Sequence, residues 1–201
     1  DASPEALRFF GKAFVAAHQT CPGGVSIEFG TRCGGSALLF ARLLEALYPS
    51  KAYGETPMLF TVDPYGNKPY QGGDYVAGGL YGPAEYVAAK RLLSWADFHA
   101  HFYMRSIDFL TSVAPRVPYF QQGCARYVTE GLTFAFLDGD HDVTTICTEV
   151  ELLTKLGRPG AVLVIDNVTN DPQTVPALQA LFGARHRVEI VAPEWAKVTL
   201  R

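Results

Sequence analysis

The chain has 201 residues, of which 48% are hydrophobic and 18% are charged, and its formal net charge is −3. This composition is that of a globular chain long enough to bury a core, and it excludes intrinsic disorder. A slightly acidic chain without a basic run argues against nucleic acid as a partner. The apolar stretches are too short to span a bilayer, so no membrane partner is expected.

The cysteines show neither a CxxC pair nor the spacing of a zinc finger; they are Cys21, Cys33, Cys124 and Cys147. This usage predicts reduced thiols and a cytoplasmic location. No signal peptide is visible, and because the chain starts at Asp1 and not at Met, we expect its natural N-terminus to have extended further.

Segments of strand and helix character alternate along the chain. Apolar residues at helical spacing predict an N-terminal helix within residues 1–22. Strands are then expected at 25–29, 58–62, 101–104, 133–137, 161–165, 188–191 and 197–200, and helices at 36–48, 84–95, 107–113, 143–156 and 173–182. Such alternation predicts an α/β fold, a Rossmann-like doubly wound and mostly parallel sheet that ends in an antiparallel C-terminal strand pair. We expect one domain over residues 1–201, and residues 114–132 remain unassigned.

Residues 65–82 are rich in glycine and tyrosine and show no periodicity. Loops of this length are uncommon in compact domains and usually serve a function. The tyrosines favour a lid or a binding loop over a linker.

Acidic side chains follow several of the expected strands. Glu28 ends the first strand, Asp138 follows the strand at 133–137, and Asp166 with Asn167 follows the next one. In an open α/β sheet, ligands bind beyond the carboxyl ends of the parallel strands. Asp138, Asp166 and Asn167 therefore predict a site for a hard divalent cation, for which Mg²⁺ is the expected ion. His141 is a candidate general base.

The turn after the first strand reads Glu-x-Gly-x-x-x-Gly-Gly-Ser and not Gly-x-Gly-x-x-Gly. Its glycines let the backbone approach a ligand, and the acidic residue before them suits a cationic or hydroxyl-rich ligand better than a phosphate. Ser36 is expected to cap the following helix. Asp63, at the end of the second strand, could accept both hydroxyls of a ribose.

Structural roles compete with each of these interpretations. Strand-end acids such as Asp63 commonly cap turns, and Asp-Gly is a common turn signal. A zinc site at His99 and His101 is disfavoured because no further ligand stands at the right spacing. Cys33 has no evident base partner, which favours a packing role.

Residues 27–36 resemble the first motif of the class I S-adenosylmethionine-dependent methyltransferases. Together with the metal triad, the chain resembles the metal-dependent O-methyltransferases of the catechol type and their macrolide-sugar relatives over residues 25–170. The resemblance implies S-adenosylmethionine and a divalent cation as cofactors, with Ser106 and Asp108 near adenine. The cofactor-binding residues that it implies are Glu28, Gly30, Thr31, Arg32, Gly34, Ser36, Asp63, Ser106 and Asp138.

The acceptor expected from this resemblance is a hydroxyl of a small molecule. Catechol enzymes carry a lysine base after the first metal aspartate, whereas this chain has His141, as in the sugar-modifying relatives. A sugar or a polyphenolic natural product is therefore expected as the acceptor, and a homodimer is a candidate assembly. The alternatives are an NAD(P)-dependent oxidoreductase on the same fold and a non-catalytic cofactor-binding protein. A metal-dependent oxygenase is weaker, since no two-His-one-carboxylate set is evident.

Overall fold

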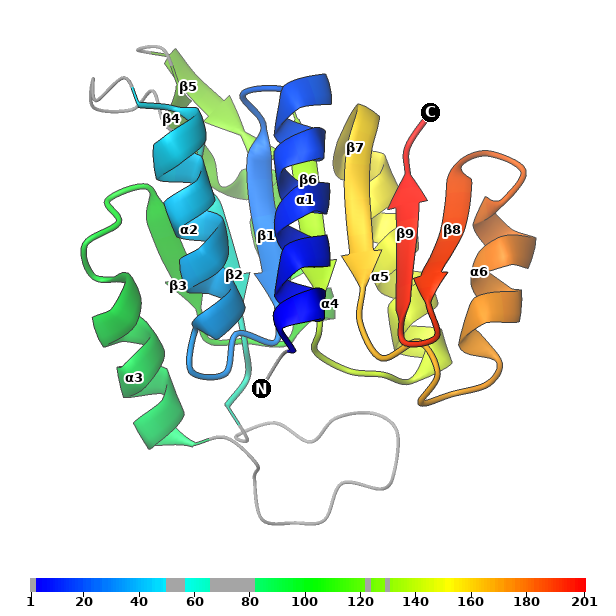
Figure 1. The fold of residues 1–201 in the computed structure, drawn as a ribbon. Helices are drawn as coiled ribbons and strands as arrows, with labels where there is room; N and C mark the ends of the chain where they lie inside the picture. The colour runs from blue at the N-terminus through cyan, green and yellow to red at the C-terminus, as the bar shows by residue number, and fades with distance from the viewer. Residues whose placement is uncertain (1–2, 50–56, 66–81, 122–123, 129–130) are drawn as a thin grey trace.

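The structure is a computed structural model that describes residues 3–49, 57–65, 82–121, 124–128 and 131–201. A seven-stranded sheet in the order β3-β2-β1-β6-β7-β9-β8 forms its centre (Figure 1). Its strands are β1 (Val25–Phe29), β2 (Leu59–Val62), β3 (His99–Phe102), β6 (Leu132–Leu137), β7 (Gly157–Ile165), β8 (Arg187–Ala192) and β9 (Trp195–Thr199). A separate antiparallel hairpin consists of β4 (Pro118–Gln121) and β5 (Cys124–Tyr127).

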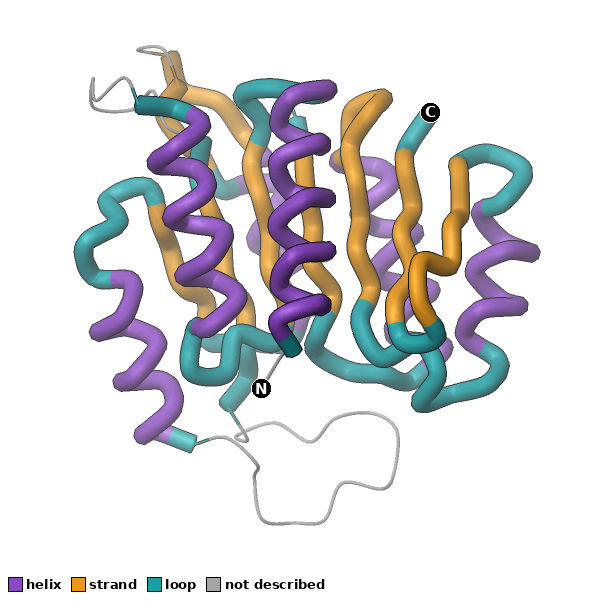
Figure 2. The backbone as a smooth tube through the Cα atoms, in the orientation of Figure 1, coloured by secondary structure: helices purple, strands orange, loops and turns teal. Residues whose placement is uncertain are grey.

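Helices cover both faces of this sheet (Figures 1 and 2). The helices are α1 (Pro4–Thr20), α2 (Gly35–Leu47), α3 (Pro83–Leu93), α4 (Ser106–Asp108), α5 (Val143–Leu156) and α6 (Thr174–Phe182). The first three lie on one face, and α4, α5 and α6 lie on the other. This arrangement confirms the predicted doubly wound α/β architecture.

The strand directions confirm a mostly parallel sheet with an antiparallel end. β3, β2, β1, β6 and β7 pair in parallel, whereas β9 runs antiparallel to both β7 and β8. The register aligns the last residues of the central strands: Phe29 pairs with Val62 and with Leu137, and Leu137 pairs with Ile165. Because these strands end level, the residues that follow them emerge along one edge of the sheet.

Aromatic packing holds α1 and α2 against the sheet. Phe14 on α1 stacks on Phe40 of α2 with ring centroids 5.0 Å apart, and Phe10 contacts Phe136 of β6 at 4.6 Å. All four rings are at most 1% exposed. Burying one such side chain contributes about 1.5–3 kcal/mol, so this layer fixes the helices whose ends flank the site.

Several elements differ from the sequence-based expectations. The third strand starts at His99, two residues before the expected one, and β7 extends back to Gly157. The helix expected at 107–113 is a short α-helical turn followed by a π-helix at Phe109–Val113 and a 3₁₀-helix at Ala114–Arg116. The unassigned residues 114–132 contain the β4–β5 hairpin.

Two further predictions concern the loop and the membrane. Of the expected lid at 65–82, residues 66–81 lie outside the described residues. Among the helices that the structure describes, none has the length and apolar character needed to cross a membrane.

Candidate active site

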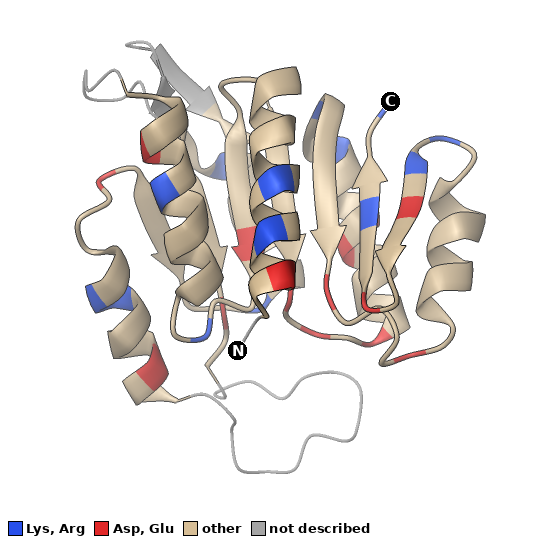
Figure 3. Ribbon diagram, in the orientation of Figure 1, with Lys and Arg blue, Asp and Glu red and all other residues tan. Residues whose placement is uncertain are grey.

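Four residues that follow four neighbouring strands form a row at the carboxyl edge of the sheet. Gly30, Asp63, Asp138 and Asp166 come directly after β1, β2, β6 and β7, whose last residues are in register. Backbone hydrogen bonds continue the ladder beyond the strands: the Asp138 amide donates to the Phe29 carbonyl at 3.0 Å, and the Asp166 amide donates to Leu137 at 3.0 Å. Acidic residues gather in the loops at this edge (Figure 3).

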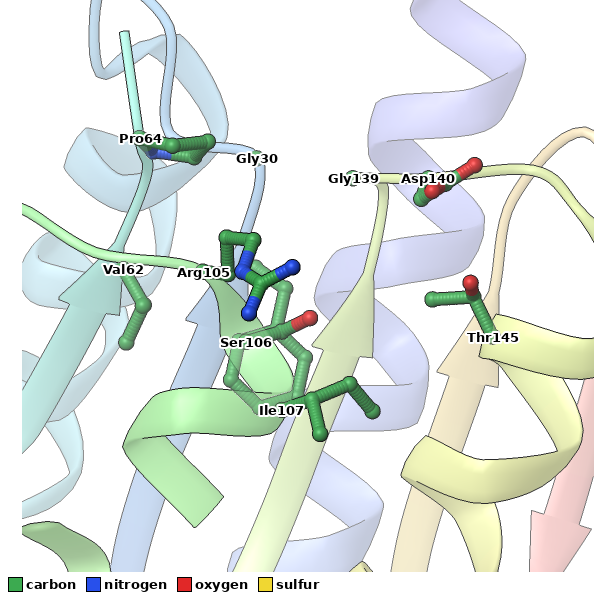
Figure 4. Close-up of a pocket in the computed structure, with 10 residues that line it drawn as sticks. Gly30, Val62, Pro64, Arg105, Ser106, Ile107, Gly139, Asp140 and Thr145 are labelled. Atoms are coloured by element: carbon green, nitrogen blue, oxygen red, sulfur yellow. The ribbon is translucent and has the colours of Figure 1, made fainter. Parts of the chain in front are cut away.

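A cavity of about 170 Å³ opens at the same edge (Figure 4). Its lining residues are Phe29, Gly30, Val62, Pro64, Arg105, Ser106, Ile107, Gly139, Asp140 and Thr145. Gly30 has φ +85°, and a side chain there would collide with the backbone carbonyl of Asp138. Only glycine fits this position, which lets the loops after β1 and β6 approach each other beside the cavity.

Glu28 is fully buried at the end of β1. Ser36 donates a hydrogen bond from its hydroxyl to Oε1, whereas Oε2 has no partner among the described residues. Burial raises the pKa of this carboxyl well above its usual value. The expected capping role of Ser36 is wrong: Ser36 lies inside α2, and the N-cap is Gly34, whose φ is +85°.

Asp63 is buried, and backbone amides occupy both of its carboxylate oxygens. The amide of Arg32 donates to Oδ2 and the amide of Tyr65 donates to Oδ1, each at 2.8 Å. Burial raises the pKa of Asp63, and these two hydrogen bonds oppose that effect. The carboxylate thus ties the glycine turn to the end of β2. The flanking residues Val62 and Pro64 line the cavity, and the predicted contact of Asp63 with a ribose stays a prediction.

The three predicted metal ligands lie together. Asp138 and Asp166 lie close enough for each carboxyl group to shift the pKa of the other, and the side-chain amide of Asn167 donates to Asp166 Oδ2 at 3.3 Å. Burial and the charge of Asp166 raise the pKa of Asp138 to about 8. Burial also raises the pKa of Asp166. Two carboxyl groups that are buried side by side repel when both are ionised, and a cation would remove this repulsion.

These donors fit a hard cation in their chemistry. Two carboxylates and one amide supply oxygen ligands, and Mg²⁺ commonly binds one or two carboxylates while it keeps several waters. Within the part of the chain that the structure describes, no group of three or more His, Cys, Asp or Glu side chains is arranged to hold a metal ion. The set would therefore need the Asn167 oxygen together with non-protein ligands.

His141 lies in the loop after β6, close enough to feel the charges of Asp140 and Asp166. Burial lowers the pKa of the imidazole, and the two carboxylates oppose this shift. A histidine with a lowered pKa is neutral at pH 7 and can accept a proton. A neutral imidazole is consistent with the role of general base, which stays a prediction.

The structure also reveals lining residues that the sequence analysis missed. Arg105 and Ile107 flank the predicted Ser106, and Arg105 forms an ion pair with Asp108 at 2.9 Å. Asp140 and Thr145 line the opposite side of the cavity. In the sequence, Arg105 and Ile107 flank Ser106, and Asp140 precedes His141. This adjacency to predicted site residues is the signal that could have identified them. Of the other predicted residues, Thr31 is buried and its hydroxyl has no partner among the described residues.

Comparison with known proteins identifies the class. A family model described as a methyltransferase domain matches residues 27–168. Among curated proteins, no relative matches this chain. The chain belongs to this methyltransferase family, and it is an S-adenosylmethionine-dependent methyltransferase.

Solved structures share the fold at low sequence identity. The calicheamicin methyltransferase CalS11 matches with a TM-score of 0.68 at 17% identity, covering 98% of this chain and 80% of its own. The O-methyltransferase TomG from Streptomyces achromogenes, in complex with S-adenosylmethionine, matches with a TM-score of 0.59 at 17% identity. The match covers 100% of this chain and 81% of TomG. An O-methyltransferase from Bacillus cereus in complex with S-adenosylhomocysteine matches with a TM-score of 0.59 at 17% identity. The match covers 99% of this chain and 82% of the Bacillus enzyme. The family assignment favours a methyltransferase over the NAD(P)-dependent oxidoreductase.

Proposed function

We propose that this enzyme transfers the methyl group of S-adenosylmethionine to a hydroxyl oxygen of a small molecule, with the help of Mg²⁺. The observation that carries the proposal is the proximity of the Asp138 and Asp166 carboxyl groups, with Asn167 and His141 next to them. This oxygen-rich cluster and the cavity lie at the same edge of the sheet.

Each residue then has a defined task. When bound, S-adenosylmethionine supplies an activated methyl group, and Mg²⁺ lowers the pKa of an acceptor hydroxyl. Asp138, Asp166 and Asn167 would hold the cation through oxygen atoms. His141 would accept the proton of the acceptor hydroxyl, since its lowered pKa keeps it neutral at pH 7. The apolar residues Val62 and Ile107 of the cavity would hold the base of the methyl donor away from water.

We further propose that the acceptor is a sugar or a polyphenolic natural product. Support comes from the histidine that follows the first metal aspartate and from the fold shared with CalS11, which is described as a TDP-rhamnose 3′-O-methyltransferase. These two observations do not distinguish a sugar from a polyphenol, so the assay samples both classes of molecule.

The test measures the transfer of radiolabelled methyl groups to a panel of nucleotide sugars and polyphenols, with Mg²⁺ and with EDTA. We expect transfer that EDTA abolishes. Asp166→Ala should abolish metal-dependent turnover and leave the Kd for S-adenosylmethionine nearly unchanged. Glu194→Ala, which removes an exposed acid near the same edge, is the matched control and should retain activity. Turnover that is equally fast in EDTA would contradict the metal-dependent mechanism.

A further inference from the structure

Glu149 is a buried acid that the proposed chemistry does not use. It lies on α5 between Ile146 and Leu153, on the face that packs into the core, and it is 0% exposed. Neither carboxyl oxygen has a hydrogen-bond partner among the described residues. Burying a carboxyl group without partners is costly, and a leucine would fill the same face of the helix without this cost. An acid at this position therefore points to a role in binding.

α5, which carries Glu149, packs against α4, which begins with Ser106. The Ser106 hydroxyl is near enough to the Glu149 carboxyl group to lower its pKa, although the structure shows no hydrogen bond between them. Ser106 itself lines the cavity, and its hydroxyl oxygen is directed towards the side where Thr145 lies (Figure 4). Thr145 stands one helical turn before Glu149 on α5. Ser106 thus connects the buried acid with the ligand space.

The charge state of Glu149 decides what Ser106 can do. Burial is the largest effect and raises the pKa of Glu149 to about 8, and among the described residues the charge of Asp140 adds to it. A neutral carboxyl group carries an O–H that can donate to Ser106 Oγ, which leaves the serine hydrogen free to point into the cavity. An ionised carboxylate can only accept, and it would turn the serine hydrogen away from the ligand.

We propose that Glu149 is a positioning residue that fixes the Ser106 hydroxyl as a hydrogen-bond donor to a ring nitrogen of the adenine of the methyl donor. The inference rests on the proposed function, because it assumes that S-adenosylmethionine occupies the cavity. Apolar walls from Phe29, Val62 and Ile107 suit a flat base, and one oriented donor among them would add specificity for its acceptor nitrogens.

The direct test is a double-mutant cycle, with the Kd for S-adenosylhomocysteine measured by calorimetry at pH 7. Glu149→Leu and Ser106→Ala should each weaken binding roughly three- to tenfold, the value of one neutral hydrogen bond. The double variant should bind as weakly as either single variant, because both changes remove one interaction. Glu151→Leu, at an exposed position on the same helix, is the matched control and should bind like the wild type.

A second set of measurements separates positioning from packing. Glu149→Gln keeps the volume and an N–H donor, so it should restore the wild-type Kd at pH 7. The wild type should then lose affinity relative to Glu149→Gln as the pH rises from 7 to 9. 5′-Methylthioadenosine contains the adenosine half of S-adenosylhomocysteine. Glu149→Leu should therefore weaken the binding of both molecules by the same factor. If Glu149→Leu does not fold, the pH profile of Glu149→Gln decides the question.

The possible results separate this inference from the proposed function. Additive losses, parallel pH profiles, or unchanged binding of 5′-methylthioadenosine by Glu149→Leu would each overturn the role of Glu149. If the wild type bound no S-adenosylhomocysteine, the proposed function would fail, and this inference would fail with it.

Discussion

Asp138 and Asp166 directly follow adjacent parallel strands, and their carboxyl groups lie close enough at the carboxyl edge of the sheet to shift the pKa of each other. The register of β6 and β7 brings the two acids together, because Leu137 pairs with Ile165 and the residue that follows each of them is the aspartate. The fold therefore creates a pair of acids that is costly to ionise without a cation. This cost can be measured without an acceptor substrate.

The first prediction concerns Asp138→Asn. Mg²⁺ at a hundredfold excess over its Kd should stabilise the wild type by about 2.7 kcal/mol and should stabilise the variant much less. In the absence of metal, the wild type should lose stability as the pH rises from the usual pKa of an aspartate to about 8. The reason is that the pKa of Asp138 is raised in the folded state, so the folded chain holds its proton to a higher pH than the unfolded chain does. Thermal unfolding with and without Mg²⁺ measures both effects. Equal metal shifts in the two proteins would remove Asp138 from the metal site.

The second prediction concerns Asp63→Ala. The change orphans the amides of Arg32 and Tyr65, and each lost partner should cost roughly 1–3 kcal/mol in the free energy of unfolding. Affinity for S-adenosylmethionine should also fall by roughly 1–3 kcal/mol, because a charged hydrogen-bond partner near the ligand is removed. Urea unfolding and calorimetry measure the two losses separately. Unchanged affinity at reduced stability would assign Asp63 to the loop alone.

The third prediction concerns His141→Ala. Removal of a general base typically lowers kcat by a factor of about 10²–10⁴. The Kd for S-adenosylhomocysteine should not change, since the base acts on the acceptor. His186→Ala, at the far edge of the sheet before β8, is the control and should keep full activity. A wild-type kcat for His141→Ala would assign the proton transfer to another group.

The fourth prediction concerns acid stability. His18 is 3% exposed, and its ring nitrogens lie 2.9 Å from the Ser26 hydroxyl and 3.0 Å from the Tyr48 hydroxyl. Burial, with a smaller contribution from the charge of Arg158, lowers its pKa from 6.5 to about 4. The unfolded chain therefore binds a proton at a higher pH than the folded one. The resulting stability is fully present above pH 6.5 and is lost as the pH falls towards 4.

His99 and His101 share this behaviour, since burial also lowers the pKa of each to about 4. Urea unfolding at pH 7 and pH 5 should show a loss of at most about 2 kcal/mol for each buried histidine. His18→Gln should reduce this loss relative to the wild type. An identical difference between the two pH values in both proteins would contradict the assignment to His18.

The sequence contained enough information for the elements that carry strong apolar patterns. The strand at 25–29 and the helix at 143–156 have the predicted bounds, because buried strands and amphipathic helices leave a clear periodicity. The hairpin of β4 and β5 was missed because it lies outside the main sheet and consists of two short strands. The π-helix at Phe109–Val113 was read as α-helix, because apolar spacing does not report the hydrogen-bond pattern.

For the site, strand-end acids could be predicted but their partners could not. The proximity of Asp138 to Asp166 followed from the rule for parallel sheets. That backbone amides occupy both oxygens of Asp63 depends on the path of the glycine turn, which local sequence does not determine. Glu149 is an acid on the apolar face of a predicted helix, which is a signal in the sequence. The signal becomes significant only once the structure shows that this side chain is buried.

We expect the methyl donor to bind in the cavity at the carboxyl edge of the sheet. The most direct test of this expectation is the titration of S-adenosylhomocysteine into the wild type, Ile107→Trp, which fills the cavity, and Leu181→Trp, at a position 52% exposed on α6. We predict one site per chain in the wild type and in Leu181→Trp, and a loss of affinity of at least about tenfold, or 1.4 kcal/mol, in Ile107→Trp. Wild-type affinity in Ile107→Trp would contradict this placement of the methyl donor.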